Sequence, residues 1–142
     1  MLDGSGSGVE GLLVGVAADS GRLLWKVPFT TEYTQNAVTP VVQGSVVIVS
    51  GLDHPVRALR VVAAKGGGWT AETVWENPDV ALYMSSPVLV AGRLYGFSHK
   101  KKGQFFCLDA ATGKNGGDAA FKVLRRYPVA ETPTWAHVGF ER

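Results

Sequence analysis

The chain has 142 residues with a formal net charge of +2, of which 46% are hydrophobic and 18% charged. This composition is typical of a globular protein and excludes the disordered class, and the length suits one compact domain. The basic residues are scattered apart from the triplet at 100–102, so the sequence lacks the dense basic face of a nucleic-acid-binding protein.

The first eleven residues, MLDGSGSGVEG, predict a flexible Gly/Ser-rich lead-in over 1–11. They contain no basic segment followed by an apolar core, so they do not resemble a signal peptide. No apolar run is long enough to cross a bilayer as a helix. We therefore expect no membrane span.

Short runs rich in Val, Leu, Phe and Tyr follow along the chain, separated by Gly and Pro. No helical period extends beyond about ten residues. In chain order, the predicted strands are RLLWKV, TPVVQ, SVVIVS, VRALRVVA, AETVWEN, SPVLVA, RLYGFS and QFFCLDA. The pattern predicts an all-β fold.

Three series of residues recur at intervals of 45 to 50 residues. They are Pro40, Pro87 and Pro133; Pro28, Pro78 and Pro128; and Gly21, Gly66 and Gly113. Four antiparallel strands repeated at this interval are the period of a β-propeller blade. In each repeat, tight turns at residues 43–44 or 91–92 join the first two strands, and the fourth strand carries Trp25 or Trp75.

The repeats predict antiparallel four-stranded blades over 12–142. We expect a half blade at 12–28, blades at 38–78 and 85–128, and a partial blade at 132–142. This amounts to about three blades, whereas closed propellers have about four to eight. We therefore expect either a fragment of a longer protein or copies that self-associate through exposed blade edges, as a homo-oligomer.

Two segments carry a family resemblance. LDAATGK at 108–114 and AADSGRLLWKVP at 17–28 resemble the two halves of the tryptophan-docking repeat of PQQ-like, quinoprotein-type β-propellers. The resemblance implies a structural role for a set of repeat residues: Gly21, Trp25, Gly66, Trp75, Asp109, Thr112 and Gly113.

The chain departs from this repeat at three places. Ala17 stands where the repeat has Asp, the middle turn KGGGW has neither Asp nor Thr, and Arg125 replaces the Trp of the third unit. We expect the last blade contact to be weaker or differently made.

The resemblance first implies a PQQ-dependent dehydrogenase. Those enzymes use a catalytic Asp, Ca²⁺ and commonly two adjacent cysteines, whereas Cys107 is the single cysteine here. We therefore assign no catalytic residue, no metal site and no cofactor, PQQ with calcium included. The alternative is a part of a quinoprotein dehydrogenase or of a hydrolase, since residues 98–101 match the SxxK pattern of serine hydrolases, although at a hairpin tip.

His54 and His99 occupy nearly equivalent turns in their repeats. Together with Lys100, Lys101 and Lys102 they form a possible loop-binding surface, although polar turn residues of this kind are also common without any function. The family resemblance implies a non-catalytic, protein-binding scaffold, as in the lipoprotein of the bacterial outer-membrane β-barrel assembly machinery. It also implies a periplasmic or secreted location and a protein partner, with no nucleic acid.

Overall fold

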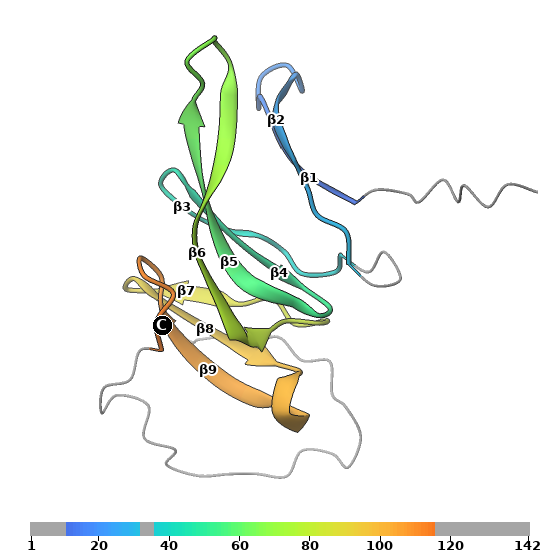
Figure 1. Ribbon diagram of the computed structural model, residues 1–142, viewed down its shortest axis with the longest axis vertical. Coiled ribbons are helices and arrows are strands. Elements are labelled where there is room, and N and C mark those ends of the chain that lie inside the picture. The colour runs from blue at the N-terminus through green and yellow to red at the C-terminus, as the bar shows by residue number, and fades with distance from the viewer. Residues whose placement is uncertain (1–10, 32–35, 116–142) are drawn as a thin grey trace, which may run out of the picture.

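The computed structural model describes residues 11–31 and 36–115 (Figure 1). Three expectations from the sequence fall outside these residues: the lead-in at 1–11 except for Gly11, the departure at Arg125, and the partial blade at 132–142. The described chain forms β-strands joined by turns, with one 3-10 turn, η2 (Lys100–Lys102). The predicted fold class, antiparallel all-β, is confirmed.

The strands form three sheets whose neighbours are all antiparallel. The first sheet contains β1 (Leu12–Val16) and β2 (Leu23–Pro28). The middle sheet contains β3 (Val41–Gln43), β4 (Val46–Gly51), β5 (His54–Ala63) and β6 (Trp69–Ala81). The last sheet contains β7 (Val88–Val90), β8 (Arg93–Ser98) and β9 (Gln104–Asp109). In each sheet the strands pair in chain order, as in a propeller blade, and the described sheets do not close a ring.

The first hairpin turn of the middle sheet lies one residue later than predicted. Gln43 pairs with Val46, so residues 44–45 make the turn, whereas Ala91 and Gly92 make the equivalent turn in the last sheet. A one-residue shift in register moves every side chain to the opposite face of a strand. The two sheets therefore correspond through the prolines that precede them, not through the glycines of their turns.

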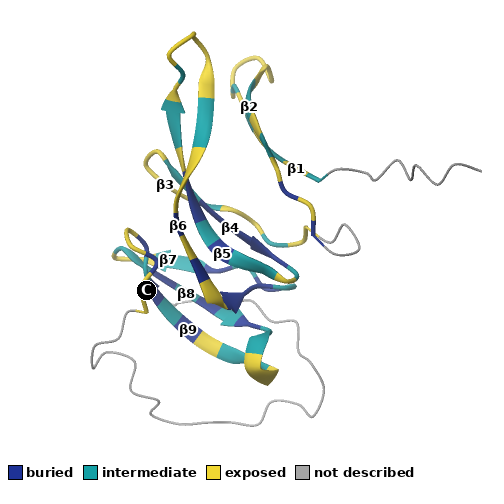
Figure 2. Cartoon of the chain, in the orientation of Figure 1, coloured by how far each residue is buried: buried dark blue, intermediate teal, exposed yellow. Residues whose placement is uncertain are grey.

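The hydrophobic core lies in two layers between the stacked sheets. The layer between the first and middle sheets contains Phe29, Val49 and Leu59. The layer between the middle and last sheets is larger, and Figure 2 shows most of the buried residues there. Burying a side chain such as Leu94 or Leu108, both 0% exposed, contributes about 1.5–3 kcal/mol. The sheets are thus held together face to face by apolar packing.

The fourth strand of the middle sheet is longer than the seven residues AETVWEN of the prediction. β6 runs from Trp69 to Ala81, and its pairing with β5 continues outward as a two-stranded ribbon beyond β3 and β4 (Figure 1). Two register shifts, between Pro55 and Val56 and between Ala58 and Leu59, interrupt this pairing. Such bulges bend and twist a strand, which allows β6 to follow both the sheet and the ribbon.

Candidate interaction surface and the contacts that position it

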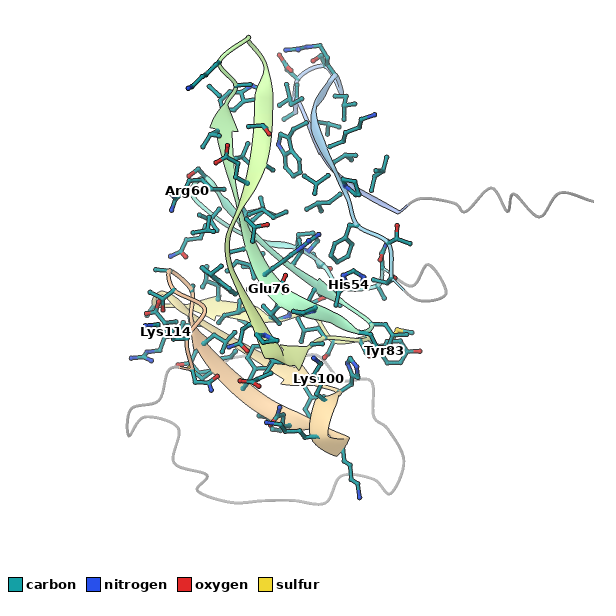
Figure 3. All side chains as sticks on the ribbon, viewed as in Figure 1. His54, Arg60, Glu76, Tyr83, Lys100 and Lys114 are labelled. Atoms are coloured by element: carbon teal, nitrogen blue, oxygen red, sulfur yellow. The ribbon has the colours of Figure 1, made fainter. Side chains whose placement is uncertain are left out.

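Turns from two sheets meet at one end of the molecule. Strands alternate in direction, so the turn after the second strand and the connection to the next sheet lie at the same end. Figure 3 shows His54, Tyr83 and Lys100 in one corner, with Arg60 and Lys114 away from it. We call this group the turn surface; it comprises Asp53, His54, Tyr83, His99, Lys100, Lys101 and Lys102.

Three residues of the turn surface have left-handed backbone conformations. The φ angles are 58° for Asp53, 54° for Lys101 and 64° for Lys102. This region costs a residue other than glycine roughly 1–2 kcal/mol, and Asp tolerates it better than most. All three side chains are exposed. Backbone strain of this kind is concentrated at functional segments, where the surrounding structure maintains it.

His99 connects the last sheet to the middle sheet. Its Nε2 lies 3.3 Å from Oδ1 of Asp53, and its backbone N–H donates to the carbonyl of Ala81 at 3.1 Å. The edge of the ring faces Tyr83, with 6.1 Å between the ring centroids. Nδ1 is buried and has no hydrogen-bond partner among the described residues. The imidazole is therefore held between two turns.

His54 makes the corresponding connection one sheet earlier. Its ring packs against the ring of Phe29 with centroids 5.3 Å apart, and the guanidinium carbon of Arg57 lies 5.2 Å from the centroid of the Phe29 ring. A cation over an aromatic face contributes about 0.5–1 kcal/mol at a partly exposed site. Each histidine thus contacts the sheet that precedes its own.

The three lysines of η2 differ in their contacts. Nζ of Lys100 donates to the carbonyl of Pro78 at 2.6 Å, which ties η2 to β6. Lys101 and Lys102 are exposed. Two cationic side chains are therefore available to a partner at this end of the molecule.

Two buried serines, Ser50 and Ser98, support the turn surface from below, and the sequence-based prediction of this surface included neither of them. Oγ of Ser50 donates to the carbonyl of His54 and accepts from the N–H of Leu82, both at 2.9 Å. Oγ of Ser98 accepts from the N–H groups of Ala81 at 3.0 Å and Lys100 at 3.2 Å. The signal in the sequence was a serine at the end of the second strand in both repeats.

The environment of Ser98 bears on the hydrolase alternative. The residue is 0% exposed, and its hydroxyl oxygen accepts two backbone hydrogen bonds. A serine nucleophile must reach its substrate and must have a base within hydrogen-bond distance. The SxxK match therefore coincides with a serine that supports the connection between two sheets.

The turn at residues 109–113 lies at the opposite end of the last sheet. The Asp109 carboxylate accepts hydrogen bonds from Thr112 Oγ1 at 2.9 Å, Thr112 N–H at 2.9 Å and Ala111 N–H at 3.1 Å. These bonds favour the ionised carboxylate, and the one from the Thr112 hydroxyl is the largest cause that lowers the pKa of Asp109. Asp109 and Thr112 thus fix the shape of the turn, which we call the last turn.

Trp75 of the middle sheet packs onto the last turn. Its indole Nε1 donates to the carbonyl of Ala110 at 3.0 Å, and Asn77 Nδ2 donates to the carbonyl of Gly113 at 2.7 Å. The ring covers Gly113 so closely that a Cβ at this position would clash with Cε3 of Trp75. Gly113 also has a φ of 68°, a conformation that side chains disfavour. The structure therefore brings Trp75, Asp109, Thr112 and Gly113 together.

Trp25 and Gly66 are placed differently from Trp75 and Gly113. The indole of Trp25 lies over Gly15 of its own sheet and is half-buried. In the turn at 64–68, which we call the middle turn, Gly67 and Gly68 both have positive φ, 88° and 82°, and it is the N–H of Gly67 that donates to the carbonyl of Ala64. By this geometry Gly67, and not Gly66, corresponds to Gly113. The sequence missed this because three consecutive glycines offered no way to choose among them.

Gly21 closes the first turn, residues 17–21, with the hydrogen bonds of the last turn. Its N–H donates to the carbonyl of Ala17, as Gly113 donates to Asp109, and its φ is 67°. No atom lies within 4 Å of the position of a Cβ on Gly21. The first turn thus has the shape of the last turn without a side chain packed onto it.

The described residues contain no group of three or more His, Cys, Asp or Glu side chains placed to hold a metal ion. No helix in this part of the chain has the length and apolarity needed to cross a membrane.

Comparison with known proteins agrees with the sheet architecture. A search of curated proteins found no match. The family model described as outer membrane protein assembly factor BamB matches residues 3–116, most of the 142-residue chain. That match spans the three sheets and the last turn. The chain belongs to the PQQ-like repeat family of the outer membrane protein assembly factor BamB.

Proposed function

We propose that this chain is a non-catalytic propeller module that binds a protein partner through the turn surface, in the periplasm of a bacterium. The family description names an assembly factor for outer membrane proteins, which supports a partner in the cell envelope. The contact between His99 and Asp53 carries the proposal, because it joins turns from two sheets into one surface. Strands that are fixed by buried cores hold these turns in place.

The chemistry of the turn surface suits protein recognition. The rings of Tyr83 and His99 meet edge to face, and the exposed cations of Lys101 and Lys102 follow His99 closely along the chain. Protein interfaces combine aromatic groups near the centre with polar groups at the rim. The side chain of Asp53 is 63% exposed and remains available to a partner even while it contacts His99. An acidic or mixed polar segment is the partner surface that this arrangement favours.

A photo-crosslinking experiment tests the location of the surface. A photoreactive residue replaces Lys101, and the matched control carries it at Lys65, an exposed lysine of the middle turn. After irradiation in envelope extract, we expect a discrete crosslinked product from position 101 and none from position 65. A photoreactive residue at Tyr83 should also give a crosslinked product in the otherwise wild-type chain. The double variant Lys101→Glu and Lys102→Glu should lose this product from position 83.

Equal products from positions 101 and 65, or a product that persists in the double variant, would argue against this surface. The Lys65→Glu variant provides the charge control, since it changes the net charge at the opposite end of the middle sheet. It should leave the crosslink at Tyr83 unchanged.

We further propose that the module works without PQQ. The Asp109 carboxylate is engaged within its own turn, and Ser98 is enclosed, which supports a structural role for both. Adding PQQ with Ca²⁺ should change neither the visible absorbance of the mixture nor the melting temperature of the protein. A saturable shift in either quantity would favour the dehydrogenase alternative.

A further inference from the structure

The face of the first sheet that points away from the middle sheet is apolar and exposed. Side chains alternate along a strand, so Leu12, Val14 and Val16 share one face, and Leu23 is paired with Val16. These four residues are between 46% and 54% exposed. On the opposite face of β1, Leu13 packs against the core between the first and middle sheets. We call the exposed set the first outer face.

The corresponding face of the last sheet is buried. The first turn and the last turn share a hydrogen-bond pattern, in which the N–H of Ala17 donates to Arg22 as that of Asp109 donates to Lys114. Counting back from the turns, Val14 and Val16 correspond to Phe106 and Leu108, which are 6% and 0% exposed and belong to the core with the middle sheet. The first outer face therefore has the residues of a face that another sheet covers.

The first turn shows the same contrast. Gly113 lies under the indole of Trp75, whereas Gly21 has open space where its Cβ would lie. The backbone conformations of the two glycines are nearly equal, with φ of 68° and 67°. What differs between the two turns is the presence of a neighbouring sheet.

The last sheet also has an apolar face that points away from the middle sheet. Phe97 pairs with Phe105 and Tyr95 pairs with Cys107, on the face opposite Leu108. The two phenylalanine rings meet edge to face with centroids 5.2 Å apart, and Phe105 is 63% exposed. We call this the last outer face. Within residues 11–31 and 36–115, the row of three sheets thus has an apolar face at each end.

We propose that the first outer face of one copy of the chain stacks on the last outer face of a second copy. This contact would repeat, between copies, the sheet-on-sheet packing that already joins the sheets within the chain. Both apolar faces are present on one chain, and a net charge of only +2 gives weak repulsion between copies. Because the two faces differ, the contact is heterologous, and two copies that make it twice close a ring.

Sedimentation velocity over a dilution series tests this inference, which goes beyond the proposed function and does not depend on it. The wild-type chain should show a concentration-dependent dimer. Val14→Lys on the first outer face and Phe105→Lys on the last outer face should each raise the dissociation constant about tenfold or more. Val74→Lys is the control, because this β6 residue is 38% exposed and belongs to the middle sheet, away from both outer faces.

A mixing experiment distinguishes a heterologous contact from other association. Every contact joins one first outer face to one last outer face, so in a solution of either single variant every contact contains a substituted face. A mixture of Val14→Lys with Phe105→Lys retains one intact pair of faces, so it should recover dimer that neither variant forms alone. If Val14→Lys loses the far-ultraviolet circular dichroism of the wild type, Leu23→Lys on the neighbouring strand takes its place.

A wild-type monomer at all concentrations would overturn the inference, as would equal loss of dimer in Val74→Lys. Failure of the mixture to recover dimer would overturn the heterologous pairing. A monomer that still crosslinks a partner from position 101 would leave the proposed function intact, so the two proposals fail separately.

Discussion

Trp25 and Trp75 occupy the same place in consecutive repeats but make different contacts. Each pairs with a small residue of the third strand, Gly15 for Trp25 and Ala58 for Trp75. Trp75 reaches across to the last turn and hydrogen-bonds to it. The indole of Trp25 lies on its own strand partner, Gly15, and hydrogen-bonds to none of the described residues.

The two tryptophans differ in their contacts because the sheets that they face differ: Trp25 faces the middle sheet and Trp75 the last sheet. Leu59 and Leu108 hold equivalent positions, since they pair with Val47 and Leu94, respectively. The last turn begins directly after Leu108, but the middle turn begins five residues after Leu59, at Ala64. At about 3.3 Å per residue, the four extra residues move the middle turn about 13 Å outward. The β5–β6 ribbon therefore stands where Trp25 would otherwise meet a turn, and β2 lies against β6.

The largest expected effect separates the two tryptophans directly. Trp75→Ala removes a buried ring and its hydrogen bond to Ala110, and should lower the free energy of unfolding by about 3–5 kcal/mol. Trp25→Ala removes a half-buried ring and should cost about 1–2 kcal/mol. Urea denaturation followed by circular dichroism measures both. Equal losses would show that the hydrogen-bonded contact has no special weight; Trp69→Ala, at an exposed site, is the control.

The two turn glycines offer the next comparison. Gly113→Ala places a Cβ against the Trp75 ring in a left-handed conformation, so we expect a loss of about 2–4 kcal/mol. Gly21→Ala has the same backbone strain, but its Cβ would lie in open space, so we expect the free energy of unfolding to fall by only about 1 kcal/mol. Thermal unfolding of both variants measures the difference. A Gly21→Ala variant as unstable as Gly113→Ala would mean that the side chain is not the cause.

The amide of Asn77 gives a smaller, separate test of the contact between the middle sheet and the last turn. Asn77→Ala removes the hydrogen bond to Gly113 and a second one, from the N–H of Asp79 to Oδ1. We expect a loss of about 1–2 kcal/mol in urea denaturation. Glu76→Ala, at the exposed neighbouring position, should stay within about 0.5 kcal/mol of the wild type.

The smallest expected effect is the pH-dependent contribution of the Asp109 carboxylate to stability. The first turn has no such carboxylate, because Ala17 occupies the position of Asp109 there. The folded-state pKa of Asp109 lies below the unfolded value of about 3.9, so its carboxylate stabilises the fold above that pH. This stabilisation is lost as the pH falls through the folded-state pKa. The wild type should therefore exceed Asp109→Asn in stability at pH 7, with the difference shrinking below about pH 4. A difference that stays constant down to low pH would exclude this role for the carboxylate.

The sequence predicted some strand and turn positions correctly and others not. The β8 prediction, RLYGFS, matches the strand at 93–98, because Ala91 and Gly92 allow only one tight turn before it. The turn before β4 was wrong by one residue, because Gly44 has polar neighbours on both sides and either register keeps a tight turn. The role of Gly67 was missed for a similar reason, since residues 66–68 are all glycine.

The turn surface was predicted in part. His54 and His99 were predicted from equivalent positions in two turns, and the three lysines from their place directly after His99, whereas Asp53 and Tyr83 were not predicted. Asp53 meets His99 from another sheet, 46 residues away, and Tyr83 belongs to a connection without a repeated pattern. Contacts between sheets depend on how the sheets stack, which no local pattern specifies.

The sequence by itself determined the all-β class, the repeat length and the four-strand unit, because strand periodicity and turn residues act locally. Only the tertiary structure decided which tryptophan reaches a turn. That outcome depends on the length of the β5–β6 ribbon in the neighbouring sheet, because the ribbon carries the middle turn away from Trp25.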